Sequence, residues 1–205
     1  MLAVVDYGVG NLFSLTCSLR AVGVEAAVTG DEAVLARADR VILPGVGAFG
    51  DAADALRRTG LDQAVLREAE RGKPLLGICL GMQLLLDYST EYGRHRGLGL
   101  IPGSVQAIRP EVPRSYKVPH MGWNALRFPK DRPPSPLFRY IQEGDCVYFV
   151  HSYAGTDCEE YTIATAEYGP ELTAAVARDS VYGVQFHPEK SGPVGLNILK
   201  AFCEL

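Results

Sequence analysis

The chain has 205 residues, 47% of them apolar, so it can bury a sizeable core within one domain. Its 20 basic and 24 acidic side chains give a formal net charge of −4. This argues against nucleic acid or an anionic membrane as the main partner, because both need a concentrated positive field. No apolar stretch approaches the ~20 residues of a membrane helix, and the cysteines show neither metal-type spacing nor a CxxC pair. We therefore expect one cytoplasmic domain over residues 1–205, with no metal site and no disulfide framework.

Short apolar runs alternate with longer amphipathic segments in the first half of the chain. Four of these runs are predicted to be buried strands: Leu2–Val5, Glu25–Val28, Val41–Leu43 and Leu75–Ile78. Between them, Leu12–Ala21 and Leu61–Glu70 carry apolar residues at helical spacing. Alternation of strands and helices predicts an α/β fold with a mainly parallel sheet flanked by helices.

The middle of the chain has a different pattern. Between Ile101 and Tyr168 prolines and aromatic residues are frequent, and shorter alternating runs occur at Cys146–Val150 and Tyr161–Thr165. We predict that these runs are antiparallel strands added to the parallel core. A final strand at Val181–Phe186 and a helix from about 194 to 202 complete the fold.

Residues 77–81 read Gly-Ile-Cys-Leu-Gly between an apolar strand and a helical pattern. This is the thiol version of the nucleophile elbow, in which glycines leave room for a sharp turn at the apex residue. The helix N-terminus would favour the thiolate of Cys79, and the backbone N–H of Leu80 could stabilise an oxyanion. The alternative is a structural cysteine, since most free cysteines are buried and inert. The other four lack this context and are interpreted as core or surface thiols: Cys17, Cys146, Cys158 and Cys203.

A thiol nucleophile needs a base, and the chain has only four histidines. His187 is the favoured base, because Glu189 would share its face in an extended segment and could orient the imidazole. The alternative is that His187 simply ends a strand and Glu189 is solvated. Pairing with the elbow makes that alternative the weaker one. His120 and His151 stay open, with loop or binding roles favoured over general base.

A second glycine-rich turn, Pro44-Gly-Val-Gly47, directly follows the third predicted strand. Its backbone N–H groups could complete an oxyanion hole together with Leu80. A phosphate cradle or a plain turn are the alternatives, although the Gly-Lys-Ser/Thr ending of a P-loop is absent. Residues 6–11 also resemble a dinucleotide-binding glycine motif but lack the third glycine.

These motifs together resemble the class I (triad) glutamine amidotransferases, through Gly77–Gln83 and Phe186–Glu189. More narrowly, the chain is similar to the glutaminase subunits of imidazole glycerol phosphate synthase. Segments that carry the narrower resemblance extend over essentially the whole chain: Asp6–Asn11, Pro44–Phe49, Gly97–Gly103, Val118–Asn124, Tyr148–Tyr153 and Gln185–Ser191.

The resemblance implies that glutamine is hydrolysed through a cysteine thioester, without a cofactor. The implied triad is Cys79 as nucleophile, His187 as proton shuttle and Glu189 as its orienting carboxylate. Residues implied in the oxyanion hole are Leu80, Gly45, Val46 and Gly47. Residues implied in holding the substrate are Gln83, Ser152 and Tyr153.

The resemblance also implies a heterodimer with a (β/α)₈ cyclase subunit that receives the ammonia directly. That partner would form imidazole glycerol phosphate and an aminoimidazole carboxamide ribotide (AICAR) in histidine biosynthesis. Asn11, Trp123 and Lys190 are placed at the interface, although a lone Trp in a loop also fits local packing. Three alternatives remain: an amidotransferase of another pathway, a free-standing cysteine hydrolase, and a partner-binding module with a vestigial triad.

Overall fold

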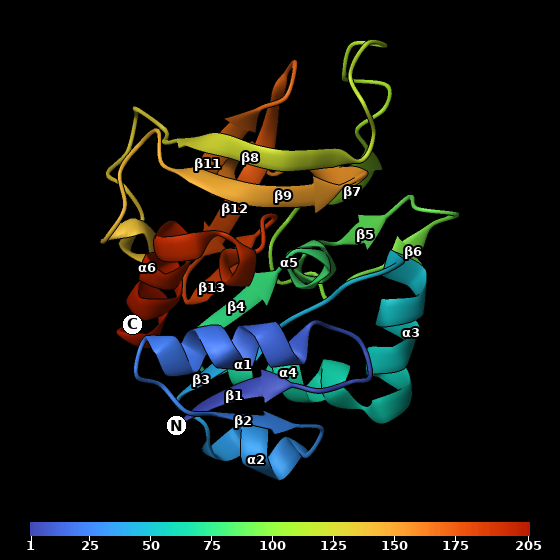
Figure 1. The fold of residues 1–205 in the computed structure, drawn as a ribbon. Coiled ribbons are helices and arrows are strands. Elements are labelled where there is room, and N and C mark those ends of the chain that lie inside the picture. The colour runs from blue at the N-terminus through green and yellow to red at the C-terminus, as the bar shows by residue number, and fades with distance from the viewer.

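A nine-stranded mixed sheet forms the centre of the computed structural model, which describes residues 1–205 (Figure 1). Its parallel part contains, in spatial order, β2 (Ala26–Thr29), β1 (Leu2–Val5), β3 (Arg40–Leu43), β4 (Leu75–Ile78) and β13 (Val181–Val184). The antiparallel part continues with β12 (Glu171–Arg178), β11 (Thr162–Glu167), β8 (His120–Arg127) and β9 (Cys146–His151). The predicted α/β class, with antiparallel strands added to a parallel core, is confirmed.

Helices cover both faces of the parallel part, as the continuous burial of β1, β4 and β13 requires. On one face, α1 (Leu12–Ala21) and α6 (Gly192–Cys203) pack on a core that includes Val4 and Ile42. The other core contains α2 (Glu32–Arg37), α3 (Phe49–Thr59), α4 (Leu61–Glu70) and α5 (Leu80–Leu85). No helix is both long enough and apolar enough to span a membrane.

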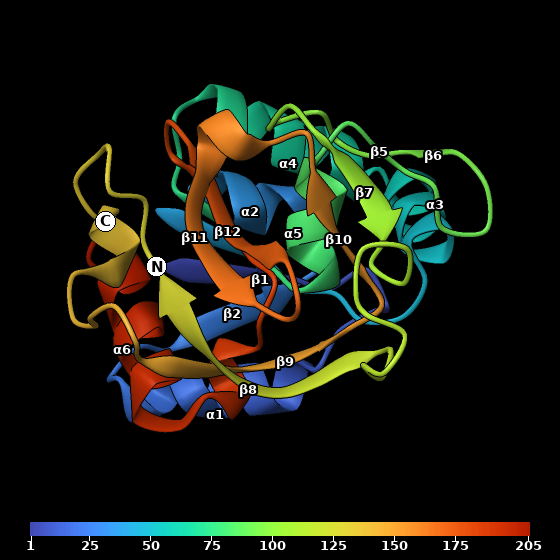
Figure 2. The same ribbon diagram turned by 90° about the horizontal axis from the view of Figure 1, so that it is seen from above.

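A smaller sheet lies beside the main one. Its order is β10 (Tyr153–Thr156), β7 (Ser104–Ala107), β5 (Tyr88–Ser89) and β6 (His95–Arg96), and β6 packs against α3 (Figure 2). Three single turns of 3-10 helix complete the chain: Pro136–Phe138, Glu159–Tyr161 and Pro188–Lys190. The strand β10 follows β9 closely, so one segment of chain joins the two sheets.

The last strand is shorter than predicted. It ends at Val184 rather than Phe186, because its parallel neighbour β4 turns into α5 at Cys79 and offers no further partner. Beyond this point the His187 N–H donates to Tyr148 O on β9 (2.9 Å). The chain is thereby redirected across the carboxyl end of the parallel strands, where open α/β sheets bind ligands.

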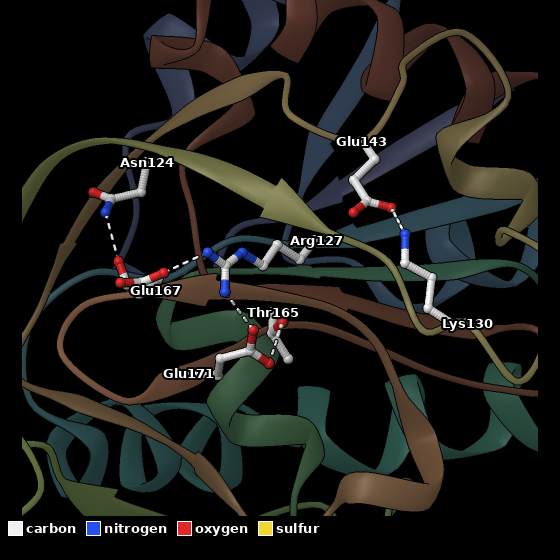
Figure 3. Close-up of polar contacts among 7 residues, drawn as sticks. All are labelled: Asn124, Arg127, Lys130, Glu143, Thr165, Glu167 and Glu171. Atoms are coloured by element: carbon white, nitrogen blue, oxygen red, sulfur yellow. Dashed lines mark hydrogen bonds and ion pairs between the residues drawn. The ribbon is translucent and has the colours of Figure 1, made fainter.

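Ion pairs tie the antiparallel strands together (Figure 3). Arg127 on β8 pairs with Glu171 on β12 (2.8 Å) and with Glu167 on β11. The Asn124 amide donates to Glu167 O (2.8 Å), and Thr165 donates to the Glu171 carboxylate (3.2 Å). Since these ion pairs are half exposed and screened by solvent, we assign them to the alignment of the strands rather than to bulk stability.

Candidate active site

The strand, sharp turn and helix predicted around Cys79 are present. Cys79 has φ 55° and ψ −109°, a strained conformation for a residue with a side chain. A Cβ atom built on Gly81 would lie 1.9 Å from Leu43 O, and one built on Gly77 would lie 2.6 Å from Gly81 O. The two glycines therefore let β3, β4 and α5 approach each other closely enough to form the turn.

His187 and Glu189 lie beside the nucleophile, and both side chains are almost fully buried. The His187 Nδ1 atom and a Glu189 carboxylate oxygen are 2.8 Å apart. The extended geometry expected for this segment is present at His187 but ends there, because Pro188–Lys190 forms a 3-10 turn. The turn instead brings Glu189 back to the imidazole, and the Ser191 hydroxyl donates to His187 O (2.6 Å) to hold it.

The charge state of His187 follows from these neighbours. Burial lowers the pKa of the imidazole, but hydrogen bonding to Cys79 and Glu189 and their negative charges outweigh burial and raise it to about 9. The imidazole is therefore protonated at neutral pH beside the thiol. A protonated imidazole beside the sulfur is the arrangement that activates a cysteine nucleophile.

Two buried glutamines connect the nucleophile to β10. Gln185 Nε2 lies 3.7 Å from Cys79 Sγ and donates to it, while Gln185 Oε1 accepts from Gln83 Nε2 (3.0 Å). Gln83 Nε2 also donates to Tyr153 O (3.0 Å), so both hydrogens of this amide are used within the protein. Only the Gln83 carbonyl is left for a substrate. No role is predicted for Gln185 from the sequence alone. A polar residue between the apolar Val184 and Phe186 is nevertheless a signal by which a buried functional side chain could have been predicted there.

Most of the predicted site residues line one cavity of about 370 Å³. Members of this set are Val46, Gly47, Cys79, Leu80, Gln83, Ser152, Tyr153, His187 and Lys190. Leu80 is the first residue of α5, so its N–H has no acceptor within the helix and is available to an oxyanion. Gly45 lies behind this cavity, against Tyr7 and the start of α5.

Glu91 also lines the cavity and was not predicted. One of its carboxylate oxygens accepts from Phe49 N (2.6 Å), where α3 begins. The second oxygen remains available to a cationic group in the cavity. Glu91 lies in the polar segment between β5 and β6, without hydrophobic periodicity, so the sequence offered no local signal for it.

The two histidines left open form a buried chain behind the cavity. His151 donates through Nδ1 to Tyr153 O (2.9 Å), its Nε2 faces His120 Nδ1 (3.0 Å), and His120 Nε2 lies 2.7 Å from Asn124 Oδ1. Burial lowers the pKa of His151 to about 3 and also lowers the pKa of His120. The low pKa keeps His151 neutral at physiological pH, and the chain of contacts holds β10 in place.

The three predicted interface residues lie around this cavity. Asn11 caps α1 and borders a cavity of about 10 Å³ that His187 also lines. The half-exposed Trp123 ring packs edge-on against Tyr148, with 6.0 Å between ring centroids. Lys190 lines the catalytic cavity, and its Nζ lies 5.9 Å from the same Tyr148 ring. Contact with a partner at this rim stays a prediction.

Turnover through Cys79 should fall as the pH rises through about 9, because deprotonated His187 cannot protonate a leaving group. The raised pKa of His187 also stabilises the fold: this contribution is complete below the unfolded value of 6.5 and is lost as the pH rises through about 9.

Glu189→Gln removes one charge that raises the pKa of His187, so the alkaline limb of kcat should move to lower pH. An unchanged limb would show that Glu189 does not control His187.

The fold and the site define an α/β enzyme with a cysteine nucleophile, of the kind that transfers acyl groups through a thioester. The chain belongs to the class-I glutamine amidotransferase family, whose model matches residues 3–204. Its relatives include the "Imidazole glycerol phosphate synthase subunit HisH" of Syntrophotalea carbinolica, 47% identical over 209 aligned positions that cover 100% of both chains. The subunit of the same name from Geobacillus thermodenitrificans is 50% identical, covering 98% of this chain and 94% of that one. A crystal structure of a glutamine amidotransferase has the same fold, with a TM-score of 0.75, 18% identity, and coverage of 98% and 97%.

Proposed function

We propose that this chain is the glutaminase subunit of an imidazole glycerol phosphate synthase. It hydrolyses L-glutamine to glutamate and ammonia and delivers the ammonia to a cyclase subunit. The observation that carries the glutaminase step is the buried His187–Glu189 pair beside Cys79 at the elbow. The pathway rests on similarity along the whole chain to proteins of that name.

In the first half-reaction the Cys79 thiolate attacks the side-chain carbonyl carbon of glutamine. The carbonyl oxygen becomes an oxyanion, and we assign the N–H of Leu80, the first residue of α5, as a donor to it. His187 donates its proton to the leaving nitrogen, so that the C–N bond breaks and ammonia departs. Glu189, 2.8 Å from Nδ1, orients and stabilises the imidazolium before this transfer. The product on the enzyme is a glutamyl thioester.

In the second half-reaction water replaces ammonia. His187, now neutral, removes a proton from the water molecule, and the resulting hydroxide attacks the thioester carbon. The C–S bond then breaks, and glutamate leaves with an oxygen from water. The thiolate and the imidazolium are restored together, which returns the site to its starting charge.

The rest of the cavity suits the amino-acid end of glutamine. The free carboxylate oxygen of Glu91 offers an acceptor for the α-ammonium group. Ser152 and Tyr153 line the same cavity beside the buried His120–His151 chain, which fixes the backbone there. We assign Ser152 and Tyr153 to the substrate, with Gln83 contributing at most its carbonyl group.

A partner surface next to the cavity follows from the chemistry of ammonia. Ammonia that escapes into water becomes protonated and loses its nucleophilicity, so a closed route between two active sites preserves it. Large apolar side chains are exposed on two elements, Phe13 on α1 and Met121 and Trp123 on β8. Together with Asn11 and Lys190, we assign them to the cyclase interface.

The proposal predicts weak glutamate release by the isolated chain and strong stimulation by the cyclase subunit with its nucleotide ligand. One backbone donor in an oxyanion hole contributes about 2.7–4 kcal/mol, which is enough for a stimulation of roughly 10²–10³-fold if the loop Pro44–Gly47 is completed on binding. Glutamate release is measured with the chain alone and in the complex. Cys79→Ala serves as the blank and Cys17→Ala, an exposed cysteine, as the matched control.

Stimulation that disappears in Cys79→Ala and persists in Cys17→Ala would support both the nucleophile and the pathway. Equal turnover with and without the cyclase would contradict the assignment of the partner and favour an independent hydrolase. Turnover that does not depend on Cys79 would contradict the glutaminase assignment itself.

A further inference from the structure

Tyr7 forms the only side-chain hydrogen bond to the loop Pro44–Gly47. It lies just beyond β1, is 5% exposed, and donates from its hydroxyl to Pro44 O at 2.8 Å. Burial is the larger cause, and the nearby Cys79 the smaller one, that raises the pKa of this phenol well above its usual value. Tyr7 is therefore protonated throughout the physiological range and acts as a permanent donor.

The same half of the loop is packed tightly against backbone. A Cβ atom built on Gly45 would lie 2.8 Å from the Tyr7 hydroxyl oxygen and 2.9 Å from Gly81 N at the elbow. A Cβ atom built on Gly10 would lie 3.3 Å from the Pro44 ring. The peptide between Pro44 and Gly45 is thus held by one hydrogen bond and by close contacts on two sides.

The other half of the loop is open. Val46 is 41% exposed, and a Cβ atom on Gly47 would meet no atom within 4 Å. Gly47 has φ +94°, a conformation from which glycine rotates without steric penalty. Val46 and Gly47 both line the catalytic cavity together with Cys79.

We propose that Tyr7 is a positioning residue for glutamine hydrolysis: it anchors the Pro44 carbonyl, so that rotation of the loop is confined to the peptides of Val46 and Gly47. This inference rests on the proposed function. With the carbonyl anchored, the rotatable peptides present an N–H group to the oxyanion from a fixed base. Without the hydroxyl, the Pro44–Gly45 peptide gains additional orientations, and the population of loops that present a donor falls.

The test compares Tyr7→Phe with Tyr182→Phe, a buried tyrosine on β13 outside the site. Both variants lose one tyrosine hydroxyl and keep the ring, but only the Tyr7 hydroxyl makes a hydrogen bond within the protein. We expect Tyr7→Phe to lower kcat by roughly 10-fold or more, but by no more than the complete loss of one oxyanion donor would. KM should stay within about twofold of the wild-type value. Alkylation of Cys79 by iodoacetamide should stay within about twofold of wild type, because attack on that saturated carbon forms no oxyanion.

A second readout is independent of turnover. Amide hydrogen exchange at Gly45, Val46 and Gly47 should be faster in Tyr7→Phe than in wild type and unchanged in Tyr182→Phe. This readout separates the glutaminase function from the anchoring role of Tyr7. A wild-type chain without Cys79-dependent glutaminase activity would contradict the proposed function, whereas the exchange rates would still test the anchor.

Three results would overturn the inference. A parallel fall in alkylation and turnover would mean that Tyr7 acts on the thiol. A rise in KM at constant kcat would assign it to substrate binding instead. Unchanged exchange in the loop, whatever the kinetics, would show that the hydroxyl anchors nothing.

Discussion

Cys79→Ala should reduce glutamate release by a factor of at least ~10⁴, because no other group in the cavity can form the thioester. Residual turnover would come only from binding and from the oxyanion donors, which alone give a much smaller acceleration. The measurement is single-turnover glutamate release at saturating glutamine, with circular dichroism to show that the fold is intact. Turnover within about tenfold of wild type would exclude Cys79 as the nucleophile.

The strained backbone at Cys79, which the nucleophile requires, should lower the free energy of unfolding. Cys79 has φ 55°, where a side chain is strained and glycine is not. Cys79→Gly should therefore have a free energy of unfolding about 1 kcal/mol greater than Cys79→Ala, with both inactive. Urea denaturation of the two variants measures the difference. A less stable glycine variant would indicate that the turn is relaxed rather than strained.

The second large effect is expected at Gly81, the glycine that follows the nucleophile. In Gly81→Ala the new methyl group would lie 1.9 Å from Leu43 O, which belongs to the backbone of β3 and cannot rotate away. We expect a loss of about 3 kcal/mol or more in the free energy of unfolding, because α5 must move away from the sheet. Turnover should also fall, since Leu80 and Cys79 would move together with the helix.

Gly72→Ala is the matched control for this substitution. Gly72 has a positive φ of 78° with no atom near its Cβ position, so alanine there meets backbone strain but no collision. Its destabilisation should stay near the ~1–2 kcal/mol of that strain, with turnover unchanged. Similar losses in both variants would contradict the collision at Gly81.

The elements with strong local patterns were predictable from the sequence. β1, β4, α1 and α4 have the predicted bounds, because an apolar run or an amphipathic period depends on neighbours in the chain. The elbow at Cys79 was equally local, since its two glycines are needed within five consecutive residues. Pairing of His187 with Glu189 was anticipated, but through an extended strand, whereas a 3-10 turn produces it.

Contacts between distant segments were decided only by the tertiary structure. Gln185 reaches Cys79 across 106 positions, and Tyr7 reaches Pro44 across 37. Neither contact leaves a periodic signal, because it arises where separate strands end at the same edge of the sheet. Glu91 enters the cavity from outside any regular pattern for the same reason. By itself, then, the sequence determined the strands, the helices and the apex of the elbow, which depend on local dihedral and burial preferences. The tertiary structure alone decided which buried polar groups satisfy one another around the thiol, because burial forces them to pair with whatever donor the fold brings near.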